Sequence, residues 1–294
     1  MELVNIPCNI CGSRDYTLIC NCIIAPADAA IGPKTLDLAK CRQCGLVFVS
    51  PQPVFSKEEL DNLYSQDYFQ TGYMKFYAAE KKSAVQSNEA FSYRLALIER
   101  FKKNGRMLEI GCATGEFLRL SREMGWRVQG IEISRYAADN AIKNYNLEVF
   151  KGALEEACLS PASFDVIVAG DILEHMPDPK GFLMRIETLL KNDGIVYIAV
   201  PNFASFHYWF MSVIAKFTHK NYFVLPHHLY HFSAATLTRL LGDVGFSVKE
   251  KILSHSRCAE KGFKGFMVQV ILLIGILLGM PDRLILIARK REAS

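Results

Sequence analysis

The sequence predicts an α/β protein whose main domain is a doubly wound, mostly parallel sheet, and three observations lead to this prediction. After residue 105, short apolar runs alternate with segments of helical periodicity, which is typical of parallel strands joined by covering helices. The first of these runs leads into a glycine-rich stretch, LEIGCATGEF, at 108–117. Two cysteine pairs precede both features, so a small separate module is expected ahead of the sheet.

Composition limits the classes of function. Hydrophobic residues make up 50% of the 294-residue chain, so it can bury a sizeable core. The formal net charge is +4, from 34 basic and 30 acidic residues, and no basic stripe stands out. We therefore expect no nucleic-acid partner. The first residues do not have the basic, apolar and small-residue order of a signal peptide, so a cytoplasmic location is expected.

The cysteines of the N-terminal part predict a metal site. Two CxxC pairs, each followed by glycine, are formed by Cys8, Cys11, Cys41 and Cys44. In a reducing compartment, four thiolates in this arrangement suit a tetrahedral zinc ion with a structural role. Cys20 or Cys22 could replace one ligand, and four unrelated core cysteines are the alternative. We expect a zinc-binding module over 1–54, where the metal substitutes for a core that so few residues cannot build.

The remaining elements follow from periodicity and from helix-breaking residues. A helical lead-in is expected over 55–104, because NEAFSYRLALIERFKKNG has apolar residues at three-to-four spacing and a glycine stop at Gly105. From residue 105 the predicted strands are RMLEIG, WRVQGIEIS, LEVFKG, FDVIVAGD, IVYIAVPN, FSVKEKILS and RLILIARK. The predicted helices between the first five are GEFLRLSREMG, RYAADNAIKNYN and PKGFLMRIETLLKNDG. This alternation predicts a parallel sheet covered on both faces.

Residues directly after the strands are the candidates for ligand binding, because doubly wound sheets bind ligands beyond the carboxyl ends of their strands. Gly111 and Gly115 let the backbone approach a ligand at a helix N-terminus. Glu132, after the second strand, can accept both hydroxyls of a ribose. Ala113 stands where a dinucleotide fingerprint has glycine, and Glu109 would repel a pyrophosphate. An adenosine cofactor with positive charge and no phosphate fits best, which indicates S-adenosylmethionine.

Residues 105–250 resemble the class I S-adenosylmethionine-dependent methyltransferases. The resemblance rests on MLEIGCATGEFL, on SFDVIVAGDILEHMPDPKGFLMRIETLLKNDGIVYIAVPN and on HHLYHFSAATLTRLLGDVGF. These stretches are similar to the branch that contains ubiquinone-pathway O-methyltransferases and several sugar and polyketide methyltransferases. The segment from CNICGS to CRQCGLVFVSPQP resembles the cysteine-rich module of some bacterial small-molecule and sugar methyltransferases. The resemblance implies a Rossmann-like sheet of seven strands, mostly parallel, whose last strand is antiparallel and pairs with FSVKEKILS at the sheet edge.

The resemblance also implies how the cofactor is held. The expected contacts are Glu109, Gly111, Ala113, Gly115, Glu132, Ile133, Ala153, Leu154 and Asp171. The acid and glycines of the first loop would surround the methionine part, and Glu132 would bind the ribose. Ile133 would pack on the adenine, and Asp171 would line the cleft. Ala153 occupies a position where many relatives have an acid, so contact through its backbone is expected.

Methyl transfer requires in-line attack on the methyl carbon, and a hydroxyl or acidic carbon must also lose a proton. His228 or His231, in the group His227-His228-Leu-Tyr-His231, is expected to act as the base or to orient the acceptor, because histidine titrates near neutral pH. His175 is the other candidate, and it either contacts the substrate or braces its loop.

A second metal is an open alternative. In the ubiquinone-pathway branch, the pattern matched here by Asp171, Glu174 and His175 is associated with a divalent metal, so these residues could hold magnesium. The alternative is that Glu174 and His175 only brace the loop after the fourth strand.

Two apolar segments complete the chain. The aromatic-rich stretch 201–232 is expected to be a substrate lid. The stretch FMVQVILLIGILLGM at 266–280 is predicted to be a helix, and it is shorter than the roughly 20 residues that span a bilayer. Either it packs against the sheet between the last two strands, or it lies on a membrane surface together with FHYWFMSVIAKF at 206–217. The second arrangement would suit a lipid-linked substrate.

The sequence therefore predicts methyl transfer from S-adenosylmethionine to a hydroxyl or carbon of a small molecule, such as a sugar or an isoprenoid-linked or lipid-linked metabolite. A ribosomal-RNA methyltransferase with a zinc module is one alternative, disfavoured because AGDILEH replaces the Asn-Pro-Pro-aromatic motif of many base N-methyltransferases. A dehydrogenase is a second, disfavoured by Ala113 and Glu109. A non-catalytic scaffold that binds the cofactor is a third.

Overall fold

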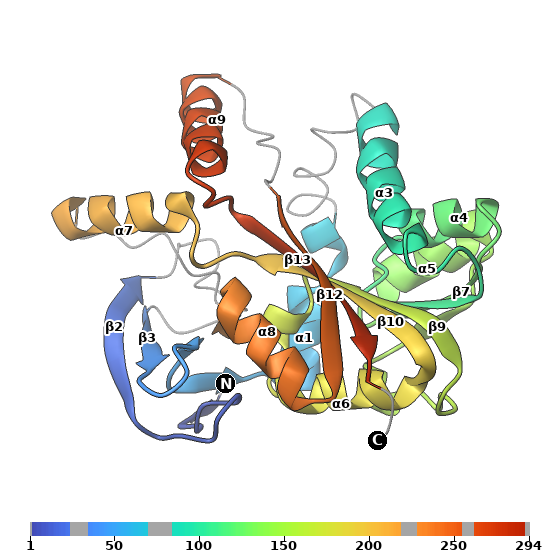
Figure 1. Ribbon diagram of the computed structural model, residues 1–294, viewed down its shortest axis with the longest axis horizontal. Helices are drawn as coiled ribbons and strands as arrows, with labels where there is room; N and C mark the ends of the chain where they lie inside the picture. The colour runs from blue at the N-terminus through green and yellow to red at the C-terminus, as the bar shows by residue number, and fades with distance from the viewer. Residues whose placement is uncertain (1, 24–34, 70–83, 219–227, 255–261, 292–294) are drawn as a thin grey trace.

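The computed structural model describes residues 2–23, 35–69, 84–218, 228–254 and 262–291. These residues form a central seven-stranded sheet, a four-stranded sheet and a two-stranded sheet (Figure 1). Helices cover both faces of the central sheet, and the four-stranded sheet lies at one side of it.

The central sheet has the strand order β12-β13-β10-β9-β6-β7-β8. Its strands are β6 (Arg106–Ile110), β7 (Arg127–Glu132), β8 (Val149–Lys151), β9 (Phe164–Gly170), β10 (Leu190–Pro201), β12 (Phe246–Ser254) and β13 (Arg283–Lys290). β13 runs antiparallel to both of its neighbours, β10 and β12, whereas the other pairs are parallel. The predicted seven-stranded sheet with an antiparallel last strand is confirmed, and β12 is the strand that forms the edge.

One boundary differs from the prediction. The helix predicted over PKGFLMRIETLLKNDG ends earlier, because α6 spans Pro179–Leu189 and β10 already begins at Leu190. Leu190 pairs with Phe164 of β9, and the register then shifts before pairing resumes at Ile195. The added strand residues therefore come from a long-range pairing that local periodicity does not report.

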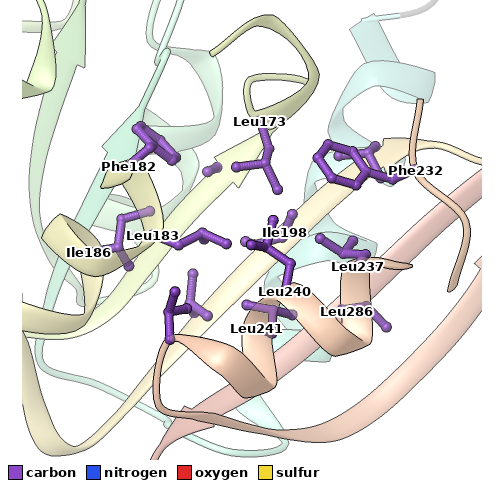
Figure 2. Close-up of a cluster of buried hydrophobic side chains, with 14 of the residues drawn as sticks. Leu173, Phe182, Leu183, Ile186, Ile198, Phe232, Leu237, Leu240, Leu241 and Leu286 are labelled. Atoms are coloured by element: carbon purple, nitrogen blue, oxygen red, sulfur yellow. The ribbon is translucent and has the colours of Figure 1, made fainter. Parts of the chain in front are cut away.

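Two hydrophobic clusters cover the two faces of the central sheet. Figure 2 shows side chains of α6 and of α8 (Ala234–Asp243) gathered around Ile198 of β10. The preceding residue, Tyr197, belongs to the cluster on the other face, together with residues of α3 (Ala84–Glu99). Alternate residues of a strand point to opposite faces, so both faces are buried, as the apolar strands predict.

The other helices follow the strands at the carboxyl edge or lead into the sheet. They are α1 (Lys57–Leu63), α4 (Glu116–Glu123), α5 (Arg135–Tyr145) and the short 3₁₀ turns η2 (Leu154–Glu156) and η3 (Leu173–His175). Helix α1 begins with a capping box, in which Ser56 accepts from the Glu59 amide and the Glu59 carboxylate accepts from the Ser56 amide. The lead-in is thus helical on both sides of residues 70–83, which lie outside the described residues.

The N-terminal residues form two small sheets. In the first, β1 (Glu2–Val4) pairs with β5 (Gln52–Val54). The second has the order β11-β4-β3-β2 and consists of β2 (Tyr16–Ile23), β3 (Thr35–Cys41), β4 (Val47–Val49) and β11 (Tyr230–His231). Its fourth strand, β11, comes from the segment predicted to be a substrate lid, so the cysteine-rich module and that segment are one structural unit.

Of the two arrangements predicted for the apolar C-terminal segment, the structure contradicts one. Helix α9 spans Gly262–Leu277 and packs against α7 (Phe206–Thr218). It stands away from the central sheet (Figure 1), so the prediction that 266–280 packs against the sheet is wrong. Among the helices that the structure describes, none is long and apolar enough to cross a membrane.

Candidate active site

The glycine-rich stretch forms a tight turn between β6 and α4. Gly111 and Gly115 have left-handed φ angles of 72° and 85°. A Cβ atom on Gly111 would lie 2.2 Å from Cδ1 of Ile172, and one on Gly115 would lie 2.7 Å from Cδ1 of Leu147. Ala113 also has a positive φ, 48°, which residues with a side chain rarely adopt. The crowding requires glycine at both positions and brings the turn against the loop that follows β9.

Glu132 ties this turn to the end of the next strand. Its Oε2 accepts a hydrogen bond from the Ala113 amide at 2.8 Å, and its Oε1 accepts one from the Ser134 amide at 2.8 Å. Burial raises the pKa of Glu132, and the hydrogen bonds from these amides act in the opposite direction. Each carboxylate oxygen keeps a further lone pair, so the side chain can still accept hydroxyl groups of a ligand.

Glu109 accepts a buried hydrogen bond from an arginine, and the sequence did not predict this contact. Its Oε1 lies 3.1 Å from Nη1 of Arg94, which belongs to α3. Burial raises the pKa of Glu109 to about 8, and the Arg94 charge acts in the opposite direction. Oε2 of Glu109 accepts no hydrogen bond from the part of the chain that the structure describes. A buried acceptor is therefore left for a donor on a ligand.

Aromatic rings hold the guanidinium of Arg94 in place. Its Cζ lies 4.9 Å from the ring centre of Phe117 and 5.6 Å from those of Phe91 and Tyr197. These cation–π contacts keep the positive charge next to Glu109. A helix with this arginine was predicted, but its rotation relative to the sheet was not, and that rotation decides which side chain reaches Glu109.

The residues predicted near the adenine lie beside Glu132. Ile133 directly follows β7 and is half-buried, and Leu154 is buried at the start of η2. The Gly152 amide donates to the backbone oxygen of Glu132 at 2.9 Å, which brings the two loops together. The Ala153 amide donates to Oε2 of Glu156 at 3.0 Å. The Ala153 amide therefore already has an acceptor within the protein. A contact from the Ala153 backbone to adenine stays a prediction.

Asp171 follows β9 with a left-handed φ of 58°. Its Oδ2 accepts a hydrogen bond from Nη2 of Arg283 at 2.5 Å. The residues whose ligand atoms gather within 4.8 Å of one another are instead Glu174, His175 and His228. The predicted magnesium site at Asp171, Glu174 and His175 is thus not supported, because Asp171 is paired with Arg283 and two imidazoles do not suit a cation that prefers oxygen ligands.

The side chains of Glu174, His175 and His228 form a cluster of titratable groups beyond the carboxyl end of β9. The rings of His175 and His228 are in edge contact, with centroids 4.6 Å apart, and Nε2 of His175 lies 3.9 Å from Oε1 of Glu174. Burial raises the pKa of Glu174 well above its ordinary value, and the charge of Asp171 adds to this effect. Neither carboxylate oxygen of Glu174 accepts a hydrogen bond within the described ranges.

His231 differs from the two histidines of this cluster in its surroundings. Its side chain is buried on β11 against Phe203, with ring centroids 5.2 Å apart. Burial lowers the pKa of His231 to about 4, so the imidazole is neutral near pH 7 and is a weak base. The remaining histidine of the predicted group, His227, lies outside the described residues.

Two tyrosines from other elements approach Glu174. Burial raises the pKa of Tyr208, in α7, to about 12, and the charges of Glu174 and Asp282 add to this effect. Burial also raises the pKa of Tyr64, which follows α1, and nearby acidic groups that include Glu132 and Glu174 contribute. Neither tyrosine was predicted as a site residue, because the order of elements along the chain does not reveal which helices close over the sheet edge.

The four predicted zinc ligands come together at the N-terminus. Sγ of Cys8 lies 3.3 Å from Sγ of Cys44, and Sγ of Cys11 lies 3.5 Å from Sγ of Cys41. All four sulfur atoms lie within 4.8 Å of one another. Four thiolates around a tetrahedral zinc ion with bonds of about 2.3 Å would be about 3.8 Å apart. The donor set and its spacing therefore fit zinc.

Hydrogen bonds connect the cysteine cluster to the loop that carries Glu174. Nδ2 of Asn9 donates to Oδ1 of Asp178 at 2.8 Å, and the Lys180 amide donates to Oδ1 of Asn9 at 2.8 Å. Asn9 lies inside the first CxxC pair, whereas Asp178 and Lys180 begin helix α6. The hydroxyl of Tyr230 also donates to the backbone oxygen of Pro177 at 3.0 Å.

Strand β11 makes the connection to His228 direct. Tyr230 pairs with Phe48 and His231 with Val47 of β4. The Val49 amide donates to the backbone oxygen of Leu229 at 2.9 Å, and the Leu229 amide donates to the backbone oxygen of Glu174 at 2.8 Å. His228 is thus fixed between the cysteine-rich module and the loop after β9.

Comparisons with known proteins were made for the whole chain. A family model described as a methyltransferase domain matches residues 83–251. A ubiquinone biosynthesis O-methyltransferase from Glaesserella parasuis is 27% identical over 188 residues, which is 58% of this chain and 78% of that protein. The chain spans only 45–70% of the length of other ubiquinone biosynthesis O-methyltransferases, which are 25–32% identical to it.

Solved structures share the fold at lower identity. An S-adenosylmethionine-dependent methyltransferase from Thermotoga maritima, a possible histamine N-methyltransferase, has a TM-score of 0.52 and 20% identity, and the match covers 76% of this chain and 98% of that one. The [4+2]-cyclase SpnF has a TM-score of 0.57 and 16% identity, with 82% and 99% covered. At these identities the likeness shows the fold alone.

Proposed function

The chain belongs to the methyltransferase-domain family and is an S-adenosylmethionine-dependent methyltransferase, and from this premise we propose that its acceptor is a hydroxyl or carbon of a small molecule. The ubiquinone biosynthesis O-methyltransferases among the relatives support a hydroxyl acceptor. The observation that carries the proposal is the cluster of buried Glu174 with the half-buried His175 and His228, which offers a proton acceptor near the carboxyl ends of the strands.

Two buried acids and one arginine suit the chemical groups of the cofactor. The open Oε2 of Glu109 would accept from the ammonium of the methionine part, and Arg94 beside it would bind the carboxylate of the same part. Glu132 would accept the ribose hydroxyls, with Ile133 and Leu154 against the adenine. The turn formed by Gly111, Ala113 and Gly115 would lie along the methionine chain. S-adenosylmethionine, when bound, supplies an electrophilic methyl group.

The residues of the cluster would prepare the acceptor. The acceptor oxygen or carbon attacks the methyl carbon, the carbon–sulfur bond breaks with its electron pair going to sulfur, and the acceptor proton passes to His228. His175 would hold the ring of His228, with Glu174 beside His175. Tyr208 would close the cleft from α7 and limit the access of water.

Zinc at the four-cysteine site would have a structural role. Four sulfur ligands leave no open coordination position for substrate, and the site lies in a separate sheet from the cofactor residues. The metal would hold β3 and β4 in place, and these strands in turn hold β11.

The first prediction concerns the ribose acid. Glu132→Ala is expected to weaken S-adenosylmethionine and S-adenosylhomocysteine binding about 100-fold, because it removes two charge-assisted hydrogen bonds. Isothermal titration calorimetry measures this change, with NAD as the control ligand. The exposed Glu155→Ala is the matched control variant, and thermal unfolding checks that both variants fold. Binding of NAD but of neither sulfur compound would contradict the cofactor assignment.

The second prediction concerns pH and Glu109. Burial raises the pKa of this carboxyl to about 8, so below pH 8 the free protein carries it mainly protonated. The ammonium of the cofactor favours the ionised form, so binding releases a proton and the affinity rises as pH increases from 6 to 8. The rise is at most about tenfold per pH unit.

Calorimetry in buffers with different ionisation enthalpies measures the released proton directly. Glu109→Gln should bind more weakly, release no proton and lose the pH dependence between 6 and 8. An unchanged proton release in this variant would show that another group titrates.

A further inference from the structure

An apolar surface on α7 and α9 takes no part in the chemistry proposed above. Eight large apolar side chains on or next to these helices are between 36% and 86% exposed. They are Trp209, Phe266, Met267, Leu273, Ile274, Ile276, Leu277 and Leu278. Single exposed apolar residues are common on proteins, but a contiguous group of this size marks an interaction surface.

The pattern along α9 shows that its outer side is as apolar as its inner side. Ile271, Leu272 and Gly275 are buried, and the exposed positions between and around them are apolar except for Gln269. A helix that only covers a protein core carries polar residues on its outer side. The outer side of α9 therefore fits an apolar partner better than water.

Helices α7 and α9 present this surface together. The Phe206 amide, at the start of α7, donates to the backbone oxygen of Met280 at 2.9 Å, just past the end of α9. Gly275 of α9 approaches closely, since a Cβ atom there would lie 3.4 Å from Cβ of Phe206. Both helices project from the sheet on the side where β10 ends and β13 begins (Figure 1). Tyr208 of α7 contacts Phe203, with ring centres 5.3 Å apart, and Phe203 contacts His231 of β11 at 5.2 Å, so the surface lies beside the segment that carries His228.

The charge of the same two segments indicates the kind of partner. Helices α7 and α9 contain two lysines, Lys216 and Lys264, and no acidic residue. An apolar surface in a positively charged part of the chain complements the apolar interior and anionic headgroups of a lipid bilayer.

We propose that α7 and α9 dock this protein on the surface of an anionic lipid bilayer, with the outer sides of both helices at the level of the headgroups. The proposal rests on the proposed function in one respect: it identifies the acceptor as a lipid-linked or isoprenoid-linked molecule that reaches the cleft from the bilayer. A second copy of this chain is a poorer occupant, because a symmetric contact would bring the same positively charged segments together.

Fluorescence of the full-length protein tests the docking directly. The chain has two tryptophans; Trp209 is 54% exposed on α7, and Trp126 is 2% exposed in the core. On vesicles of phosphatidylcholine with phosphatidylglycerol, we expect brominated lipids to quench Trp209. Trp209→Phe should remove the quenching while the protein still sediments with the vesicles. Binding should be at least about tenfold tighter than to pure phosphatidylcholine and should weaken with salt.

A charge-introducing variant with a matched control separates this surface from general stickiness. Leu273→Glu combined with Leu277→Glu should weaken vesicle binding at least about tenfold, whereas Met184→Glu, at an exposed apolar position on α6, should leave it unchanged. Both variants should bind S-adenosylmethionine like the parent, because neither site adjoins the cofactor residues. Loss of cofactor binding in the parent protein would overturn the proposed function and leave the docking result standing.

Three results would overturn the docking proposal. The first is no sedimentation with anionic vesicles at low salt, and the second is equal sedimentation of the double variant. The third is a dimer, found by light scattering, that the double variant abolishes while vesicle binding is absent; the surface would then be an interface between two copies.

Discussion

Removal of zinc from the four-cysteine site is expected to raise hydrogen exchange of the Val49 and Leu229 amides by at least about 100-fold. The reason is that the Val49 amide donates to the backbone oxygen of Leu229, and the Leu229 amide donates to that of Glu174. Without the metal, the strands of the module have too small a core to keep these segments paired. Exchange measured by mass spectrometry on peptides spanning 46–50 and 228–233, with and without chelator, tests this. Zinc content is measured on the same samples.

An amide of the central seven-stranded sheet is the control for this experiment. The Gly111 amide donates to the backbone oxygen of Ile131 at 2.8 Å, and it should stay protected when zinc is removed. Affinity for S-adenosylmethionine should change less than about threefold, because its residues sit on β6, β7 and their loops. Cys41→Ser should reproduce the effect, and Cys158→Ser, at an exposed cysteine, should not. Purified protein without stoichiometric zinc would contradict the structural assignment of the metal.

His228→Ala is expected to lower kcat between about 100-fold and 10,000-fold, the range typical for loss of a general base. Cofactor binding should be unaffected, so the loss should appear in turnover and not in titrations with S-adenosylmethionine. The assay follows formation of S-adenosylhomocysteine with a panel of phenols, sugars and isoprenoid-linked phenols. Added imidazole should restore part of the rate, since a free base can enter the space left by the ring.

His231→Gln provides the contrast. Burial holds the pKa of His231 at about 4, so this side chain does not titrate in the range where a base would act. The variant should keep most of the parent's kcat, whereas His228→Ala should lose at least about 100-fold. If His231→Gln loses at least about 100-fold in kcat and His228→Ala does not, the roles proposed for the two histidines are reversed.

The parts of the site that could be predicted from sequence are those fixed by neighbours along the chain. Glu109 and Glu132 belong to strands with strong apolar patterns, and glycines at 111 and 115 mark the turn between strand and helix. Strand order in a doubly wound sheet then brings the ends of these strands together. The paired cysteines were predictable for the same reason, because two CxxC turns define a metal site locally.

The parts that could not be predicted depend on contacts between distant segments. Arg94 reaches Glu109 only because α3 packs with one particular side toward the sheet, and helical periodicity does not tell which polar residue points inward. The pairing of Asp171 with Arg283 joins β9 to the last strand, two places away in the sheet. The prediction that helix α9 packs against the sheet was wrong because the apolar outer side of this helix resembles a buried side. Only the fold shows which side is exposed.

The position of β11 in the cysteine-rich sheet has a consequence for biosynthesis. β4 is made early in translation, but its partner on one edge, Tyr230–His231, is made only after most of the main domain. Until then β4 presents an unpaired edge, which is the kind of surface that recruits other chains. The acceptor side is thus completed only when β11 pairs with a sheet that begins at the other end of the chain. This contact is non-local, so it should form slowly. Conditions that delay this closure would cause nascent chains to aggregate. They would have less effect on cofactor binding.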